Sequence, residues 1–331
     1  MYCLENASVC ITGGTGTLGR ALVKLLLTKY SNTIKKLVIF SRDEFKQYEM
    51  AQIFPPNLFP IEYIIGDVKD KQRLLWATQQ IDILIHLAAL KRIETAEKNP
   101  YEAFLTNVVG TQNVVEVAGQ QGIKKILLYS TDKASSPNSV YGATKLCAEK
   151  LFLTAQNTTA TIIRGGNLLG SRGSVVPLFL EKRKEGFLPI TDVEMTRFSF
   201  LPEEAAFLAL EALENTIGGE IFVPKLPSYR IVDIAEAIAP DSQRKIIGRR
   251  EGEKKHDEMI ANHEAFRTIE NEKYYLIVPF VNLATYLEQH EATMVMPDFS
   301  YQSDNNTNWL TVEQIRRLIV QYIDADFQPL L

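Results

Sequence analysis

A tyrosine and a lysine four residues apart, Tyr141 and Lys145, form the spacing in this sequence that most clearly could do chemistry. If the segment is helical, they share one face, with Cβ atoms about 5–6 Å apart. The ammonium of Lys145 would then lower the pKa of the Tyr141 phenol, which is about 10 in the free side chain, and make it a general base toward an alcohol or sugar hydroxyl. The same spacing recurs at Tyr129 and Lys133, but a predicted strand separates those residues by roughly 13 Å. That second pair therefore cannot form.

A glycine-rich turn stands between a predicted first strand and a predicted first helix. Gly13 would permit the tight turn, Gly16 would let the backbone approach a pyrophosphate, and Gly19 would let the helix pack closely on the sheet. The N–H groups and the positive end of the helix would receive phosphate oxygens. Because the turn lies at the first strand–helix junction, it predicts a dinucleotide site rather than a merely flexible loop.

The end of the predicted second strand indicates which dinucleotide is bound. An acidic residue there would bind the ribose hydroxyls of NAD, whereas this chain has Ser41 and Arg42, followed by Asp43. Arg42 can form two hydrogen bonds with a 2′-phosphate, and Ser41 can donate another. We therefore expect NADP, with Asp43 keeping NAD as an alternative. Asp67, after the third strand, would lie near the adenine or cap the next helix, and both roles are compatible.

Alternating strands and helices are predicted to position these residues. Strand patterns occur at residues 7–12, 36–41, 61–67, 81–88, 125–130 and 159–164, and helical patterns at 17–30, 100–121 and 139–155. The alternation predicts an α/β fold with a Rossmann-type doubly wound parallel sheet. After about residue 165 the pattern weakens, with helices at 202–213 and 311–323 and a strand at 220–224. We expect an NADP-binding Rossmann domain at 1–165 and a smaller mixed α/β domain, mainly substrate-binding, at 166–331. The chain can cross back between the two domains.

The composition is that of an ordinary globular chain, and it excludes several classes of protein. The 331 residues include 36 basic and 40 acidic side chains, and the net charge of −4 argues against a nucleic-acid-binding protein. Cys3, Cys10 and Cys147 are too few for a disulfide framework, and no metal-ligand spacing is visible. His86 is expected to be a hydrogen-bonded core residue. The sequence shows neither a secretory signal nor an apolar stretch of roughly twenty residues. We expect a cytoplasmic protein that binds no metal, nucleic acid or membrane.

The glycine turn, residues 67–68 and 107–110, Tyr141 and Lys145 together resemble the extended short-chain dehydrogenase/reductase family. More motifs occur at residues 130–134, 141–146, 170–177, 189–192, 195–198 and 219–224. These carry a narrower resemblance, over residues 7–325, to the inverting UDP-N-acetylglucosamine 4,6-dehydratases of that family, which are described as soluble, NADP-retaining and homo-oligomeric. The family usually has a tyrosine where Gly165 stands and a proline where Glu251 stands, and the loop at 155–161 is shorter than in some members. These departures concern substrate detail rather than the chemistry.

The resemblance implies a reaction in three stages. The sugar hydroxyl at carbon 4 is oxidised, and NADP receives the hydride. Tyr141 takes the proton of that hydroxyl, Lys145 adjusts the pKa of Tyr141, and Thr131 hydrogen-bonds the same substrate oxygen. The resulting ketone acidifies the hydrogen on carbon 5, and water is eliminated across carbons 5 and 6. The hydride then returns to carbon 6 and a proton to carbon 5, which regenerates the cofactor. In the family, the product serves the synthesis of pseudaminic acid or related surface glycans.

Asp132 and Lys133 are the residues expected to carry the elimination. They follow the fifth predicted strand, at the edge where ligands bind in open α/β sheets. We assign Asp132 as the acid that assists departure of the hydroxyl. Lys133 is the candidate base, which requires a Lys133 pKa depressed by burial or by nearby positive charge. The two groups would titrate as a coupled pair. The alternative is that Asp132 caps a turn while Lys133 points into solvent.

By the same resemblance, two further sets of residues are expected to line the site. The residues expected to contact NADP are Gly13, Thr15, Gly16, Thr17, Leu18, Gly19, Ser41, Arg42, Lys46, Asp67, Val68, Ala88, Lys91, Asn107, Tyr141, Lys145 and Leu168. The residues expected to contact a UDP-sugar are Lys91, Asn167, Arg172, Gly173, Ser174, Val175, Thr191 and Arg250. The two arginines and the lysine suit a diphosphate, although each alone would be an ordinary surface cation. Asn107 would distort its helix near the active site, or simply cap backbone.

Three alternative functions share this fold. A nucleotide-sugar 4-epimerase would use Tyr141 and Lys145 without needing Asp132 and Lys133. A capsule-type dehydratase that also epimerises carbon 5 would differ mainly in the face that is reprotonated. A non-enzymatic NADP sensor would have no need of the tyrosine–lysine pair. The resemblance also implies a homo-oligomer, a dimer or a hexamer, with the helices at 100–121 and 139–155 as the dimerising faces.

Overall fold

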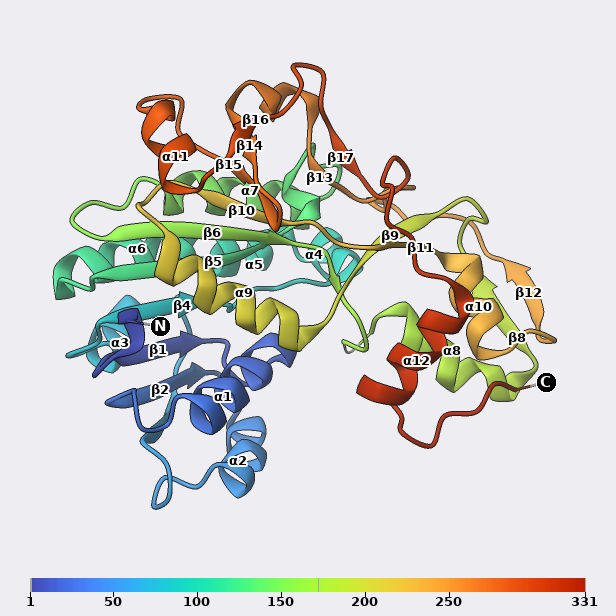
Figure 1. Cartoon of the computed structure of the whole chain (residues 1–331). Coiled ribbons are helices and arrows are strands. Elements are labelled where there is room, and N and C mark those ends of the chain that lie inside the picture. The colour runs from blue at the N-terminus through green and yellow to red at the C-terminus, as the bar shows by residue number, and fades with distance from the viewer. Residues whose placement is uncertain (1, 172, 331) are drawn as a thin grey trace.

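The central feature of the fold is one large sheet, seen in a computed structural model that describes residues 2–171 and 173–330 (Figure 1). Its strands are β1 Ser8–Thr12, β2 Lys36–Ser41, β3 Ile61–Ile65, β4 Ile83–His86, β5 Lys125–Thr131, β6 Thr159–Gly165, β10 Ile221–Pro224, β14 Thr268–Glu270, β15 Tyr274–Ile277 and β16 Thr293–Met294. Among the described residues, their order is β16-β14-β15-β10-β6-β5-β4-β1-β2-β3. The run from β10 to β3 is parallel, and the other three strands extend it in antiparallel pairing. The predicted α/β, doubly wound fold is confirmed.

The parallel strands are buried because their sequences are almost continuously apolar. Every residue of β1 and of β4 is buried, as expected for a sheet that is covered on both faces. β1 lies between β2 and β4, with Ile11 opposite both Ile39 and Ile85. The carboxyl ends of β1, β2, β4, β5 and β6 therefore meet at one edge, which is where open α/β sheets bind their ligands.

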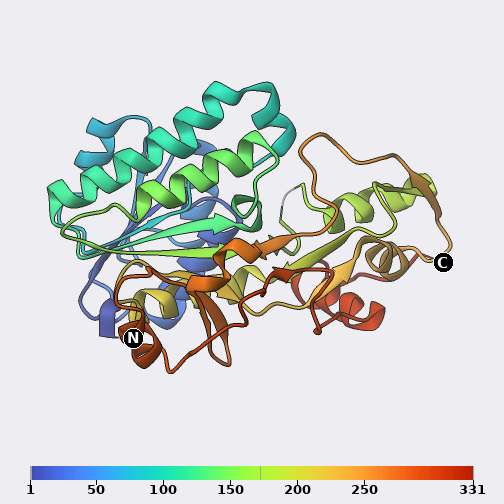
Figure 2. The ribbon, with the colours of Figure 1, turned by 90° about the horizontal axis from the view of Figure 1, so that it is seen from above.

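Helices cover both faces of the sheet. α6 and α7 pack side by side on one face, and α1 and α9 pack together on the other (Figures 1 and 2). The helices of this main body are α1 Thr17–Lys29, α2 Glu44–Ile53, α3 Lys71–Ala77, α4 Ile93–Lys98, α5 Pro100–Phe104, α6 Gly110–Gln121, α7 Val140–Phe152, α9 Pro202–Asn215 and α11 Leu283–Gln289. The single helix predicted at 100–121 is interrupted, because Leu105–Val109 forms a π-helical turn between α5 and α6.

A smaller lobe lies beside the main body (Figures 1 and 2). It contains α8 Val175–Lys182, α10 Ile231–Ile238 and α12 Val312–Tyr322, with β8 Phe187–Ile190 paired to β12 Gln243–Ile246. Phe179, Ile234 and Ile319 are buried in its own hydrophobic core. The remaining strands are β7 Asn167–Leu168, β9 Thr196–Phe200, β11 Ser228–Arg230, β13 Glu258–Ile260 and β17 Tyr301–Gln302. Because β10, β14, β15 and β16 come from beyond residue 165, both predicted domains contribute strands to the main sheet. The domain boundary at 165/166 stays a prediction.

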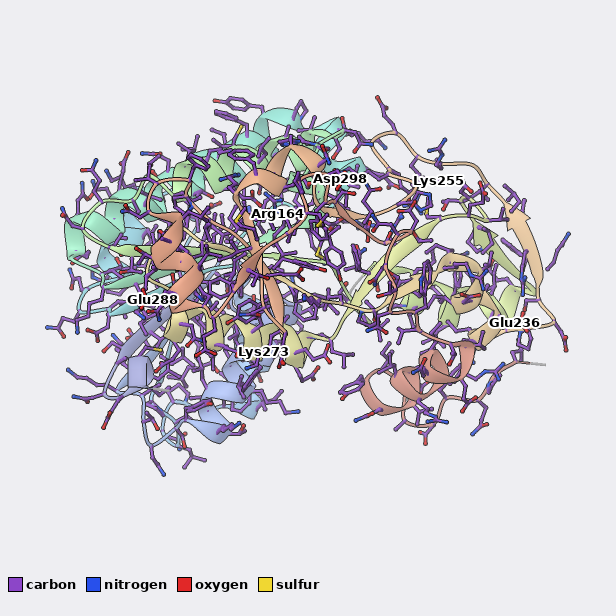
Figure 3. All side chains as sticks on the ribbon, turned by 45° about the horizontal axis from the view of Figure 1, so that its top comes forward. Arg164, Glu236, Lys255, Lys273, Glu288 and Asp298 are labelled. Carbon is purple, nitrogen blue, oxygen red and sulfur yellow. The ribbon has the colours of Figure 1, made fainter. Side chains whose placement is uncertain are left out.

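A buried ion-pair network around Arg164, labelled in Figure 3, fixes the end of β6. The Arg164 guanidinium donates to Glu149 on α7 at 2.7 Å, to Glu264 at 2.8 Å and to the carbonyl oxygen of Met259 at 2.8 Å. Glu149 also accepts a hydrogen bond from Ser130 on β5 at 2.6 Å. A buried guanidinium is costly unless it is fully paired. The network therefore holds β5, β6 and α7 in fixed positions, and these are the elements that carry the candidate catalytic residues.

Candidate active site

A cleft of about 700 Å³ lies at the carboxyl ends of the parallel strands and extends to the smaller lobe. The glycine turn lines one end, and Ser174, Thr191 and Arg250 line the other. Every predicted site residue that the structure describes lines this cleft, apart from Asp132 and Asn107. The predicted contact at Arg172 lies outside the described residues. Folding thus brings the two expected sets of contact residues into one continuous cleft.

The glycine turn has a backbone that leaves no room for side chains. Gly13 has a φ of +69°, and a Cβ there would lie 2.7 Å from the amide nitrogen of Ala88. A Cβ on Gly19 would lie 2.2 Å from the backbone of the turn. The helix that follows begins at Thr17, and its N-cap, Gly16, has no side chain that could cap the first N–H groups. The first N–H groups of this 13-residue helix are therefore available to a ligand. This geometry fits the pyrophosphate of a dinucleotide.

A basic rim lies where β2 meets α2. Arg42 and Lys46 line the cleft there. Asp43, the acidic residue that would favour NAD, instead caps α2, accepting a hydrogen bond from the backbone N–H of Lys46 at 3.0 Å. The Arg42 side chain is 60% exposed and lies 3.5 Å from Asp67. The alternative role of Asp67 as a helix cap is wrong, because α3 is capped by Asp70.

Tyr141 and Lys145 lie on α7, as their spacing predicted, but the structure corrects how they interact. Lys145 Nζ donates to the carbonyl oxygen of Tyr129 on β5 at 2.9 Å, and burial lowers the Lys145 pKa to about 8. Burial raises the pKa of Tyr141 to about 12, and the cation that acts against this rise is Lys133. The expectation that Lys145 lowers the phenol pKa is therefore wrong. A hydrogen bond joins Tyr141 to Thr131 at the end of β5.

Asp132 and Lys133 form an ion pair directly after β5. Lys133 Nζ donates to Oδ2 of Asp132 at 2.9 Å and to Oδ1 at 3.1 Å, and it lies 3.4 Å from Oδ1 of Asn167. Burial alone would lower the pKa of Lys133, but the carboxylates of Asp132 and Asp257 raise it above its usual value. The expected depressed pKa is thus wrong, because a second carboxylate faces the amine. The solvent-pointing alternative is also wrong, since the Lys133 side chain is 20% exposed and lines the cleft.

Asp257 is a cleft residue that the sequence analysis missed. Its Oδ2 accepts a hydrogen bond from Asn167 at 2.6 Å, and its Oδ1 lies 3.5 Å from Nε of Arg197. A hydrogen bond links its side chain to that of Asp132, and burial together with the Asp132 charge raises the Asp257 pKa to about 6. The only signal in the sequence was its closeness to the predicted contact Arg250. Other lining residues that the sequence analysis missed are Arg197, Tyr229, Glu253 and Lys254.

Sequence similarity to known proteins shows the family to which the chain belongs. A family described as "Polysaccharide biosynthesis protein" matches residues 9–279. The chain is a member of this family. It is 43% identical over 330 residues to the UDP-N-acetylglucosamine 4,6-dehydratase (inverting) of Campylobacter jejuni strain 81-176, covering 95% of this chain and 98% of that one. It is 36% identical over 331 residues to the UDP-glucose 4-epimerase of Rickettsia massiliae, covering 95% and 96%.

Solved structures agree with this assignment of the chain to the family. The X-ray structure of Pen from Bacillus thuringiensis matches with a TM-score of 0.88 at 34% identity, covering 96% of this chain and 98% of that one. A dTDP-glucose 4,6-dehydratase from Streptomyces venezuelae, at 19% identity and a TM-score of 0.67 over 74% and 85%, shares the fold. The resemblance to extended short-chain dehydrogenases, and to the inverting dehydratases among them, is confirmed.

Asn107 forms hydrogen bonds with the backbone and does not line the cleft. It is 2% exposed within the π-helical turn. Its side chain accepts a hydrogen bond from the N–H of Leu90 at 2.8 Å and donates to the Leu90 carbonyl and to Thr144, both at 3.0 Å. The predicted cofactor contact is therefore corrected: Asn107 ties the π turn to the segment after β4 and to α7. The predicted distortion of its helix is confirmed.

His86 is a hydrogen-bonded core residue, as expected. Its Nδ1 lies 2.7 Å from the hydroxyl of Thr12, and its Nε2 lies 3.2 Å from the hydroxyl of Thr111. Burial lowers the His86 pKa to about 3, so the ring is neutral. Within the described part of the chain, no group of three or more His, Cys, Asp and Glu residues could hold a metal ion. No helix in that part is long and apolar enough to cross a membrane.

The space beside Gly165 is filled by a side chain from the neighbouring strand. A Cβ on Gly165 would lie 2.2 Å from Oη of Tyr129. The Tyr129 hydroxyl is buried and has no hydrogen-bond partner among the described residues. The absence of a side chain at Gly165 therefore makes room for the Tyr129 ring, which itself lines the cleft.

Gly165→Ala is expected to destabilise the fold by about 1–3 kcal/mol, because overpacking strains a close-packed interior. Chemical denaturation would measure this loss, and adding Tyr129→Leu to the variant should recover most of it. The control Tyr129→Phe removes only a buried hydroxyl without a partner, so stability should stay equal or rise. A Gly165→Ala protein as stable as the parent would show that the Tyr129 ring moves aside freely.

Proposed function

We propose that this protein converts UDP-N-acetylglucosamine to a UDP-4-keto-6-deoxy-N-acetylhexosamine with inversion at carbon 5, using NADP that is tightly held and regenerated each turnover. The observation that carries the proposal is that Tyr141, Thr131 and Lys133 line the same cleft, with Asp132 ion-paired to Lys133. Oxidation alone, as in an epimerase, requires only the tyrosine and its partners. Elimination requires a further acid and base. The Campylobacter jejuni relative, 43% identical, is named for this dehydration.

In the first stage, Tyr141 takes the proton of the hydroxyl at carbon 4. Burial raises the pKa of this phenol to about 12, so its deprotonation near neutral pH requires positive charge nearby. Lys133 already supplies such charge, and Lys145 holds a second ammonium on the same helix. NADP, when bound at the glycine turn, would accept the hydride and contribute the charge of its oxidised ring.

In the second stage, Lys133 removes the proton from carbon 5. Its amine lines the cleft, and its extra proton can pass to Asp132 over the 2.9 Å contact. This transfer leaves Lys133 neutral and able to act as a base. The ketone at carbon 4 makes the carbon-5 hydrogen acidic, and an acid in the cleft must protonate the departing hydroxyl.

The far end of the cleft suits the diphosphate of a UDP-sugar. Ser174 is the N-cap of α8 but makes no capping bond, and its Oγ is buried without a partner among the described residues. Ser174 and Val175 therefore offer a hydroxyl and helix N–H groups to an anion. Lys91 and Arg250 line the same cleft and supply positive charge. This arrangement supports the contacts expected for Lys91, Asn167, Gly173, Ser174, Val175, Thr191 and Arg250.

Arg42→Ala is expected to weaken binding of NADP by about 10- to 100-fold, because a charge-assisted hydrogen bond contributes about 1.5–3 kcal/mol. Binding of NAD should change little, since NAD has no 2′-phosphate. Equilibrium titration of both cofactors would measure the two affinities. The matched control is Arg230→Ala, which removes an exposed arginine outside the cleft. Equal weakening of NAD and NADP would contradict the preference for NADP.

Proton NMR of the purified protein with UDP-N-acetylglucosamine and NADP in deuterated water would test the activity. We expect a new methyl signal at carbon 6, with deuterium at carbon 5 and the coupling of the inverted sugar. A methyl signal without inversion would keep the dehydration and overturn the stereochemistry. A sugar changed only at carbon 4 would make this a 4-epimerase.

The proposal also covers the protein's setting. We propose a cytoplasmic homo-oligomer, a dimer or a hexamer, that supplies pseudaminic acid or a related surface glycan. The three cysteines are free, which agrees with a reducing compartment. Size-exclusion chromatography with light scattering would give the oligomeric state. We further propose that residues 1–165 bind NADP and that residues 166–331 mainly cover the substrate.

A further inference from the structure

Two carboxyl groups meet beside Lys133, and only one of them reaches the cleft. Asp132 is 1% exposed and does not line the cleft, because Lys133 Nζ covers both of its carboxylate oxygens. Asp257 is equally buried within the protein, but it does line the cleft. Of the two carboxyl groups, Asp257 is thus the one placed to touch a bound sugar.

The contacts of Asp257 fix which of its oxygens can carry a proton. Oδ2 accepts hydrogen bonds from Asn167 Nδ2 at 2.6 Å and from the backbone N–H of Phe198 at 3.3 Å. The backbone N–H of Asp257 donates to Ser303 Oγ at 2.9 Å, which anchors the residue. Oδ2 is occupied as an acceptor, whereas Oδ1 lies 3.5 Å from Arg197 Nε, which is longer than an ordinary hydrogen bond. Oδ1 is therefore the oxygen that can hold a proton.

The charges around the two carboxyl groups divide them into an anion and an acid. Lys133 and Thr131 hydrogen-bond to Asp132 and lower its pKa, although burial alone would raise it. Burial and the neighbouring Asp132 charge raise the Asp257 pKa to about 6. Adjacent carboxyl groups whose environments push their pKa values apart take opposite acid–base roles. The titratable, charged and polar groups that act on Asp257 are Asp132, Lys133, Asn167, Arg197, Tyr229 and Lys254.

We propose that Asp257, rather than Asp132, is the acid that protonates the hydroxyl leaving carbon 6. The inference rests on the proposed dehydration and adds a catalytic residue to it. Asp132 becomes the residue that receives the Lys133 proton and prepares the base. The expected role of Asp132 as the acid would then pass to a residue about 125 positions later in the chain.

The protons balance over the elimination. Lys133 first passes a proton to Asp132, which leaves a neutral amine beside two protonated carboxyl groups. The carbon 5–hydrogen bond then breaks, with its proton going to Lys133, while the Asp257 proton moves to the carbon-6 oxygen and water leaves. Asp132 returns a proton to Asp257 through the hydrogen bond that joins them. The site ends as it began, with an Asp132–Lys133 ion pair and a protonated Asp257.

Asp257→Asn and Asp132→Asn, each assayed as holoenzyme with two substrates, would test the proposal. The first substrate is UDP-N-acetylglucosamine, and the second is its 6-deoxy-6-fluoro analogue, whose fluoride leaves with little need of an acid. Asp257→Asn is expected to slow elimination from the hydroxyl substrate by about 10²–10⁴-fold and to leave elimination of fluoride within a few-fold of the parent. Asp132→Asn should slow both substrates, because it disables the base. Methyl signals and released fluoride, followed by NMR, report the two rates.

The pH profile gives a readout that a purely structural role would not move. In the parent protein, elimination from the hydroxyl substrate should fall as the pH rises through about 6, since Asp257 then loses its proton. Elimination of fluoride should lack that decline, and so should the residual activity of Asp257→Asn. Retained reduction of NADP by the variant, from oxidation at carbon 4, would show that its site is folded.

The remaining outcomes overturn the proposal. If Asp257→Asn leaves the hydroxyl substrate unaffected, or slows both substrates equally, Asp257 is not the acid. If Asp132→Asn is the variant that slows elimination from the hydroxyl substrate but retains elimination of fluoride, the acid is Asp132. A parent protein that forms no 6-deoxy product from either substrate would overturn the proposed dehydration itself, which distinguishes that failure from the failure of Asp257.

Discussion

Tyr141→Phe is expected to lower the rate of oxidation at carbon 4 by about 10²–10⁴-fold, and every later stage with it. Tyr141 is 8% exposed and lines the cleft, and its phenol is hydrogen-bonded to Thr131. Phenylalanine keeps the ring that packs between α7 and its neighbours but has no oxygen to accept the substrate proton. Since elimination requires the ketone at carbon 4, no 6-deoxy product should accumulate.

Stopped-flow absorbance of the reduced nicotinamide cofactor and NMR of the product would measure the two consequences of Tyr141→Phe separately. The matched control is Tyr101→Phe, a tyrosine on α5 that is 71% exposed and does not line the cleft. This control should oxidise and dehydrate at the parent rate. Normal formation of the reduced cofactor by Tyr141→Phe would show that another group takes the proton, and Lys133, whose charge acts on Tyr141, would then be the first candidate.

The main sheet was predictable from the sequence because its strands are short, apolar and separated by helices with clear periodicity. The predicted strand at 36–41 matches β2, and the glycine turn lies at the predicted junction. The strands beyond residue 257 were not predicted. β14, β15 and β16 are two to four residues long, and their place in the sheet depends on pairing with each other and with β10. No local pattern in so short a segment specifies a distant partner.

The residues that line the cleft were also predictable, because the carboxyl ends of parallel strands converge at a known edge of the sheet. The charge states were not predictable. The sequence places Asp132 next to Lys133, but the pKa of that lysine depends also on Asp257, which is 124 positions away. The interaction of Lys145 depends on a carbonyl oxygen of β5. Both corrections come from contacts between segments that are distant in sequence.

Lys133→Arg is expected to retain oxidation at carbon 4 within a few-fold and to lower the elimination rate by at least about 10²-fold. Arginine keeps a positive charge that can pair with the buried Asp132, so the fold should survive. Its guanidinium does not give up a proton in proteins, so it cannot become the neutral base that removes the carbon-5 hydrogen. The reduced cofactor and a 4-keto sugar should therefore accumulate in a single turnover.

Comparison with Lys133→Met separates the effect of losing the base from the effect of losing the ion pair with Asp132. Methionine removes both, and leaving the buried Asp132 carboxylate without its cation should destabilise the protein by about 3–5 kcal/mol. The arginine variant should show the loss of elimination without that loss of stability. Lys150→Arg, an exposed lysine on the same α7 that carries Tyr141, is the control for the substitution itself. If Lys133→Arg eliminates water at the parent rate, the charge of residue 133 is sufficient and the carbon-5 base is another group. In that case the proposed proton transfer from Lys133 through Asp132 to Asp257 would lose its first step.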